Sequence, residues 1–244
     1  MPQKYLFSIV IPVFNEGDLI IQTLRNIHFS VKKNYEILIC YDFDDDNTLS
    51  SIANSKLPLQ LKNNIQFVKN LSHGPHSAVM TGLYKSFGAY ILVIPADDSI
   101  NSKIIHKLFK KAQEGYDIVC PSRFIKGGFM KGAPFIKTLI NRIVNILLQL
   151  SGIPTSDSTN GFRLFSRKVI DNIEIKSSHG FIYSMEYLIK AYEKNYTITE
   201  FPSKWVERNI GHSRFTLNRW WKSYLKYFLF GVYVGLKKRI CFEK

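Results

Sequence analysis

Short apolar runs alternate with segments of helical spacing through the first half of the chain. Apolar runs of this kind are typical of strands buried on both faces, and strands that alternate with helices of this length form βαβ units around a parallel sheet. The pattern therefore predicts the α/β class. We expect strands over residues 6–13, 35–41, 65–69 and 117–120 and in the run from Ala89 to Pro95, and helices over residues 17–31, 76–87 and 102–114.

The second half is less regular. Apolar residues recur at helical spacing through residues 135–150, which predicts a helix packed in the core. From residue 216 onward, aromatic side chains lie among Lys and Arg, a pattern typical of an amphipathic helix. We expect a single domain over residues 1–215 and a basic amphipathic helix over residues 216–244. That helix suits the interface of an anionic membrane, and the alternative is that it docks on the domain.

The chain carries a formal net charge of +14 over 244 residues. Such an excess indicates an anionic partner, which leaves nucleic acid, nucleotide phosphates and anionic lipid as candidates. One class of protein with such a charge binds nucleic acid. The sequence shows no helix-turn-helix, zinc or RNA-recognition signature, so we expect no nucleic-acid partner. From Lys204 onward ten basic residues face only two glutamates.

The cysteines and the apolar segments bear on location. Cys40, Cys120 and Cys241 lack metal-ligand spacing and imply no disulfide framework, so a reducing cytosol fits best. No apolar segment reaches the about 20 residues that cross a bilayer. We expect a cytoplasmic protein that is peripheral at the cytoplasmic face of the membrane.

Carboxylates follow two of the expected strands. The buried run from Ala89 ends at Pro95 and is followed by Asp97 and Asp98, while the strand over 35–41 is followed by four aspartates within residues 42–46. Ligands bind outside the carboxyl ends of strands in an open α/β sheet, and carboxylates are the ligands that Mg²⁺ and Mn²⁺ prefer. The alternative for Asp97 is a cap on the next helix.

Several motifs occur in an order that resembles the family 2 glycosyltransferases, and in particular their dolichyl-phosphate mannose synthase and polyprenyl-phosphate glycosyltransferase group. The similar segments are PVFNE at 12–16, the acidic run 42–48, HGPHSAVMTG at 73–82, Asp97-Asp98, PSR at 121–123 with Gly127-Gly128, DSTNGFR at 157–163 and RNIGHSRF at 208–215. Two positions depart from the family pattern: Tyr41 stands in place of an acid, and Pro95 stands in place of the first Asp of Asp-x-Asp.

The resemblance implies a fold and an activity. The fold would be of the GT-A nucleotide-sugar-binding type, with a mostly parallel central sheet flanked by helices, a nucleotide-sugar half over about 1–122 and an acceptor half over about 123–215. The activity would be inverting transfer of a sugar from a nucleotide-sugar to a polyprenyl phosphate, with Mg²⁺ or Mn²⁺ as cofactor.

The resemblance also implies roles for individual residues. Nucleotide contacts would come from Pro12, Phe14, Glu16, Asp42, Ala96 and Asp97. Metal ligands would be Asp97 and Asp98. The phosphate and the acceptor would be bound by Arg123, Arg208, Ser213 and Arg214. The catalytic set would be Asp97, Arg123, Asp157 and Glu186. We expect Arg163 to brace the loop that carries Asp157.

The acceptor decides whether a base is needed. A saccharide hydroxyl must lose its proton, and Asp157 or Glu186 would take it. A polyprenyl phosphate is already ionised and needs positioning and cations instead, and the basic excess favours this case. A third alternative is a relative that binds nucleotide without performing chemistry.

Overall fold

The computed structural model describes residues 5–32, 34–206 and 217–242. In chain order the elements are β1 (Tyr5–Pro12), α1 (Leu19–Ser30), β2 (Tyr35–Tyr41), α2 (Asn47–Asn54), α3 (Leu59–Asn63), β3 (Ile65–Lys69), α4 (Pro75–Lys85), β4 (Gly88–Val93), the 3₁₀ turn η1 (Asn101–Ile104), α5 (Ile105–Gln113), β5 (Ile118–Ser122), β6 (Phe129–Lys131), α6 (Phe135–Ser151), β7 (Arg163–Ser166), α7 (Arg167–Asn172), α8 (Ile182–Glu193), β8 (Ile198–Pro202), β9 (Lys204–Val206) and α9 (Leu217–Phe242).

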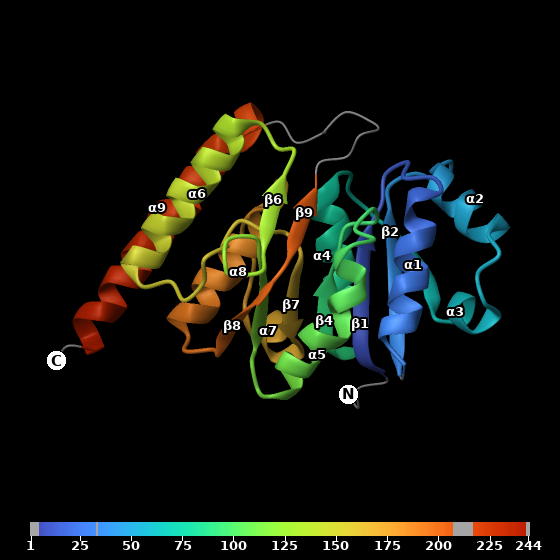
Figure 1. Cartoon of the computed structure of the whole chain (residues 1–244), viewed down its shortest axis with the longest axis horizontal. Coiled ribbons are helices and arrows are strands. Elements are labelled where there is room, and N and C mark those ends of the chain that lie inside the picture. Colours follow the sequence, from blue (N-terminus) through green and yellow to red (C-terminus); the bar gives the residue numbers. More distant parts are fainter. Residues whose placement is uncertain (1–4, 33, 207–216, 243–244) are drawn as a thin grey trace.

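Seven strands form the central sheet, in the order β3-β2-β1-β4-β7-β5-β8 (Figure 1). The pairs β2–β3, β1–β2, β1–β4 and β5–β8 are parallel, and β7 runs against both of its neighbours, β4 and β5. Six of these strands therefore point the same way. The expectation of a mostly parallel sheet is confirmed. A small second sheet pairs β6 with β9.

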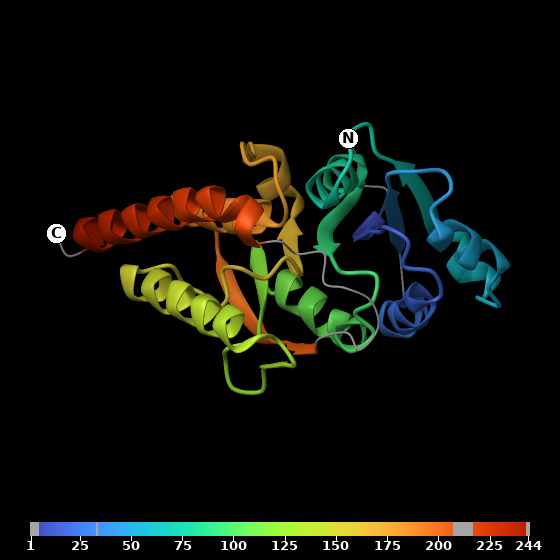
Figure 2. The ribbon, with the colours of Figure 1, turned by 90° about the horizontal axis from the view of Figure 1, so that it is seen from above.

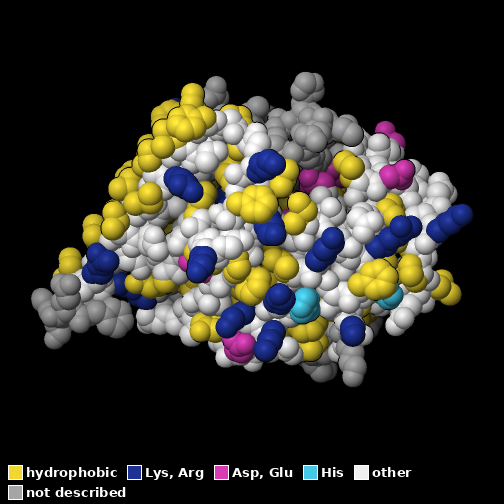
Figure 3. All heavy atoms as spheres, in the orientation of Figure 1, with side chains coloured by type: hydrophobic (Ala, Val, Ile, Leu, Met, Phe, Trp, Pro, Cys, Tyr) yellow, Lys and Arg dark blue, Asp and Glu magenta, His cyan; other side chains and the backbone are white. Residues whose placement is uncertain are grey.

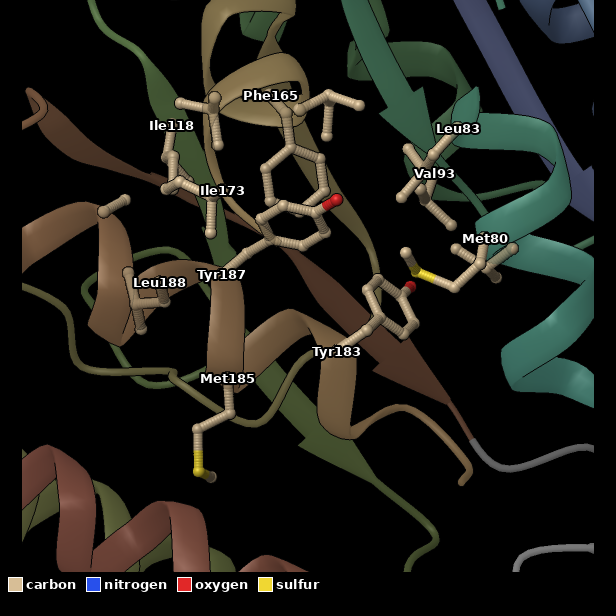
Figure 4. Close-up of a cluster of buried hydrophobic side chains, with 14 of the residues drawn as sticks. Met80, Leu83, Val93, Ile118, Phe165, Ile173, Tyr183, Met185, Tyr187 and Leu188 are labelled. Carbon is tan, nitrogen blue, oxygen red and sulfur yellow. The ribbon is translucent and has the colours of Figure 1, made fainter. Parts of the chain in front are cut away.

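Alternation along each strand sends side chains to two separate cores. Ile9 of β1 joins a cluster with α1 and α5, while its neighbour Val10 joins a cluster with α4 and α8 on the opposite face. In the second cluster the rings of Phe165 and Tyr187 lie with centroids 5.0 Å apart (Figure 4). Helices thus cover both faces of the sheet. Strand β1 ends at Pro12, because proline has no N–H to donate to the neighbouring strand.

The sequence pattern predicts many elements closely. Strands β2 and β3 have the expected residues, and α1, α4 and α5 differ from expectation by a few residues at their ends. The expected helix at 102–114 opens with the 3₁₀ turn η1 before α5 begins. The proposed division of the chain into a domain and a separate terminal helix stays a prediction.

Helix α6 forms where it was predicted, but the expectation that it packs in the core is wrong. Of its described side chains only Asn145, Leu148 and Ser151 are buried, and most of its Ile and Leu side chains are exposed. The apolar residues cover a wide arc of the helix, whereas its main neighbour is α9 (Figure 2). Helical spacing predicts an apolar side without telling what that side faces.

The basic terminal helix is present as α9. It docks on α6 and α8 and buries Tyr227 and Val234. Within the described ranges, none of the helices combines the length and the apolar character that crossing a membrane requires.

Candidate active site

The carboxyl ends of β1, β2, β4 and β5 lie at one edge of the sheet (Figure 1). Asp42 follows β2, Asp97 follows β4 and Arg123 follows β5. Because β7 runs the other way, the segment that leads into it, which carries Asp157, arrives at the same edge. The fold therefore brings these predicted residues to the edge where ligands bind in open α/β sheets.

The loop after β1 is tied to the start of α2. The Asn15 N–H donates to Asp46 Oδ2 at 3.0 Å, and the Glu16 N–H donates to Thr48 Oγ1 at 2.9 Å. Asp46 also caps α2 by accepting from the Thr48 N–H at 2.9 Å. These bonds place Phe14 at the sheet edge with 40% of its surface exposed.

Asp42 is buried and holds a neighbouring loop. Its Oδ1 accepts a hydrogen bond from Asn70 Nδ2 at 2.7 Å, and its Oδ2 accepts one from the N–H of Gly74, a residue with φ of +103°, at 2.8 Å. The carboxylate thus shapes the turn that leads from β3 into α4. Its predicted contact with a nucleotide base stays a prediction.

An aromatic cluster forms beside Asp42. The Phe43 ring stacks on the His73 imidazole, with centroids 4.6 Å apart and an angle of 10° between the planes. Phe14 meets Phe43 edge-on at 6.2 Å, and Phe43 is 43% exposed. Sequence reasoning gave a role to Phe14 and missed Phe43 and His73. The available signal was the position of Phe43, directly after the first acid behind β2.

The two aspartates after β4 have different environments. Asp98 accepts two hydrogen bonds from Asn101, one from the backbone N–H at 2.8 Å and one from Nδ2 at 2.7 Å. Burial raises the pKa of Asp98 to about 6, against the opposite effect of these bonds. The capping role that was considered for Asp97 therefore belongs to Asp98. Because both oxygens of Asp98 already accept hydrogen bonds, this geometry disfavours Asp98 as a metal ligand. Ala96, directly before Asp97 in the chain, is buried.

A divalent cation at this edge would have few ligands from protein side chains. Within the described ranges, no three His, Cys, Asp or Glu side chains are grouped to hold a metal. Mg²⁺ commonly takes one or two carboxylates together with waters and substrate phosphates. Asp97, which is partly exposed, fits the part of the single protein carboxylate, and Pro95 offers no side-chain ligand.

Arg123 and Asp157 form a buried fork. Arg123 Nε donates to Asp157 Oδ2 at 2.7 Å and Nη2 donates to Oδ1 at 2.8 Å, while the Arg123 backbone N–H also reaches Oδ2 at 3.0 Å. Thr159 Oγ1 accepts from the same Nη2 at 3.0 Å. The side chain of Asp157 is fully buried and that of Arg123 is 10% exposed. Asp157 therefore orients Arg123. Because both of its carboxylate oxygens are already bonded, this geometry disfavours the predicted role of Asp157 as a base.

Arg163 is fully buried and braces the same loop. Its Nη2 donates to the carbonyl oxygens of Asp157, at 2.9 Å, and Asn160, at 3.2 Å. This arrangement confirms the expectation from the sequence.

Glu186 is also fully buried. Its two oxygens accept from the N–H groups of Lys176 and Ser177, at 2.9 and 2.8 Å, and Lys190 Nζ lies 2.5 Å from Oε1. Burial alone raises the pKa of a carboxyl group, but these donors outweigh it and hold the pKa of Glu186 below its usual range. The geometry favours a structural role over the predicted role as a base. The predicted residues Arg208, Ser213 and Arg214 lie outside the described residues.

Taken together, the fold and this edge are typical of an α/β protein that binds its ligand where the parallel strands end. The family model for glycosyl transferase family 2 matches residues 8–174. The chain belongs to glycosyl transferase family 2, which confirms the predicted family and fold.

Two curated relatives are similar over most of this chain. It is 28% identical over 214 residues to a dolichol-phosphate mannosyltransferase of Pyrococcus furiosus, covering 85% of this chain and 58% of that protein. It is 29% identical over 187 residues to YkcC, an uncharacterized glycosyltransferase of Bacillus subtilis, covering 75% of this chain and 56% of that protein. The chain thus spans a little over half the length of these relatives.

Solved structures support the fold. A glucosyl-3-phosphoglycerate synthase of Mycobacterium tuberculosis, in complex with Mn²⁺, UDP and phosphoglyceric acid, matches with a TM-score of 0.68 and 15% identity, covering 93% of this chain and 78% of that one. A complex of the same synthase with Mg²⁺ and UDP matches with a TM-score of 0.63 and 16% identity, covering 88% of this chain and 74% of that one.

Proposed function

We propose that the protein is an inverting glycosyltransferase that moves a sugar from a nucleotide-sugar to a polyprenyl-type lipid phosphate. The observation that carries this proposal is the state of the two candidate bases. Asp157 and Glu186 are fully buried and already accept hydrogen bonds within the protein. A hydroxyl acceptor needs a base, whereas an ionised phosphate does not. The similarity to a dolichol-phosphate mannosyltransferase supports the same acceptor class.

The nucleotide would bind over β1 and β2. The half-exposed rings of Phe14 and Phe43 offer flat apolar surfaces for a base, and stacking on an aromatic ring contributes about 1–3 kcal/mol. Glu16 and Pro12 would line the ribose, next to Ala96 and Asp97. The family match and the UDP in similar solved structures support this placement.

Charge at the leaving group would be balanced from two sides. A bound Mg²⁺ or Mn²⁺ held by Asp97 would neutralise the departing diphosphate. Arg123 follows the same sheet edge, and its Nε and Nη2 are fixed by Asp157. Because the guanidinium is already ordered, Arg123 loses little side-chain entropy when it binds a phosphate.

The reaction would be a single displacement. An acceptor phosphate oxygen attacks the anomeric carbon, the bond from that carbon to the diphosphate oxygen breaks, and the nucleoside diphosphate leaves with its electron pair. Configuration inverts because attack and departure occur on opposite faces. The protein residues hold the two phosphates in line for this step.

The proposal includes a location at the cytoplasmic face of a membrane, where a soluble donor can meet a lipid acceptor. The three cysteines are free thiols, which agrees with a reducing compartment.

Product analysis tests the proposal. The purified protein is incubated with a panel of nucleotide-sugars and with either polyprenyl phosphate or saccharide acceptors. We expect an inverted glycosyl phosphate from polyprenyl phosphate, lost in Asp97→Asn and kept in the matched control Asp45→Asn, an exposed carboxylate near the same edge. A saccharide product alone would favour the hydroxyl acceptor. Nucleotide binding with no product would favour the catalytically inactive relative.

A further inference from the structure

Helices α6 and α9 expose large apolar side chains along their whole length. Each of the following is at least 40% exposed: Phe135, Ile136, Leu139, Ile140, Ile143, Ile146, Leu147 and Leu150 on α6, and Trp221, Leu225, Leu229, Tyr233, Leu236 and Ile240 on α9. Figure 3 shows hydrophobic side chains along the slanted edge that these two helices form in Figure 1. We call this set of residues the α6–α9 face. A contiguous exposed apolar patch of this extent marks an interaction surface.

The two helices pack closely against each other. They run side by side and parallel, since Gly231 packs on Leu148 and Gly235 packs on Ser151 (Figure 2). A Cβ atom on Gly235 would lie 2.6 Å from the Ser151 carbonyl oxygen, so only glycine permits this approach. The face is therefore a preformed surface rather than two independent stripes.

Charge decides what covers this face. Helices α6 and α9 together contain eight Lys and Arg residues and no Asp or Glu. Lys222, Lys226, Lys237 and Arg239 are exposed. A second copy of the chain would bring two purely basic helix pairs together. An anionic lipid surface offers both an apolar layer for the Leu and Ile side chains and negative headgroups for the cations.

The face also connects to the candidate active site. Ser158 donates its N–H to Asn145 Oδ1 of α6 at 2.6 Å, next to Asp157. Arg142 of α6 and Arg123 both lie over the ring of Phe124, at 5.8 and 5.3 Å from its centroid. A surface that rests on α6 therefore lies beside the loop that orients Arg123.

From these observations we propose that the α6–α9 face docks on an anionic lipid bilayer, with both helices lying in its interface. Sequence patterning suggested such a role for the terminal helix alone, whereas the structure makes α6 an equal part of the surface. The inference rests on the proposed function for its purpose, because docking would bring a lipid phosphate to Arg123.

Vesicle binding without donor or acceptor tests docking separately from catalysis. The full chain is sedimented with vesicles of phosphatidylcholine containing phosphatidylglycerol, and with phosphatidylcholine alone. We expect binding to the anionic vesicles that weakens with added salt and falls more than about tenfold in a triple variant of α6. That variant is Ile140→Gln, Ile143→Gln and Leu147→Gln. The matched control replaces apolar residues elsewhere that are at least as exposed, with Phe29→Gln, Leu59→Gln and Leu71→Gln, and keeps wild-type binding.

Three results would overturn the proposal: no binding by the wild type, equal losses in the triple variant and its control, or a wild-type dimer that the triple variant converts to monomer without any vesicle binding. The last result would assign the face to a second copy. Vesicle binding with no transfer to polyprenyl phosphate would refute the proposed function alone. Transfer to a detergent-dispersed acceptor with no vesicle binding would refute docking alone.

Discussion

Replacement of Asp157 by Asn should destabilise the protein strongly. The substitution keeps the size of the side chain and removes its charge, which leaves Arg123, whose side chain is only 10% exposed, without its carboxylate partner. Breaking a buried ion pair on one side typically costs about 3–5 kcal/mol. Since the amide oxygen of the replacement would still accept one hydrogen bond, we expect a loss of about 3 kcal/mol in the free energy of unfolding.

Urea denaturation measures this loss. With a denaturant slope of about 3 kcal/mol/M, the expected loss moves the midpoint down by about 1 M. The matched control is Glu114→Gln, which breaks the exposed pair with Lys111, where the side chains are 39% and 37% exposed. Exposed pairs contribute less than about 1 kcal/mol, so the control should move little. Equal shifts in the two variants would refute the view that Asp157 is a buried structural partner of Arg123.

Three further predictions concern the metal ion, the binding of the nucleotide base and the stability of the protein in acid. Chelation of divalent cations should abolish sugar transfer and Asp97→Asn should do the same, while the circular dichroism spectrum stays unchanged; transfer that persists in chelator would contradict the metal role. Phe43→Ala should weaken nucleotide binding by about 1–3 kcal/mol in calorimetry, and an unchanged affinity would remove the ring from the base site. Burial alone would raise the pKa of Asp117, but hydrogen bonds from Lys168 and Thr197 outweigh it and hold this pKa below its usual range. Ionised Asp117 therefore stabilises the folded protein above a pH of about 4, and this stabilisation is lost as the pH falls through the lower pKa of the folded state. The difference in free energy of unfolding between the wild type and Asp117→Asn should therefore become smaller on acidification.

The sequence predicted those parts of the fold that depend on local pattern. Strands β2 and β3 have the residues that the sequence predicts, because short segments rich in apolar and β-branched residues and bounded by polar residues are local signals. The exposure of α6 could not be obtained in this way. Its apolar spacing is the same whether a sheet or a membrane lies opposite, and the answer depends on α9, about 80 residues later in the chain.

The candidate site shows the same limit. Motif order brought Asp42, Asp97 and Arg123 to one sheet edge, as the strand directions confirm. The partners of the individual carboxylates were not predictable, because they are distant in sequence: Asp157 lies 34 residues from Arg123, and Asp42 lies 32 residues from Gly74. Only the folded structure shows which carboxylates already accept hydrogen bonds from other parts of the protein.

The position of β7 governs how the chain holds together. The order β4-β7-β5 inserts a strand from after residue 122 between two strands that precede it. A fragment ending at residue 122 would retain β4 and β5 without the neighbour they share, and such unpaired strand edges recruit other chains. The two halves are therefore expected to fold only as one cooperative unit, and a gene split at this point should yield aggregates rather than two complementing pieces.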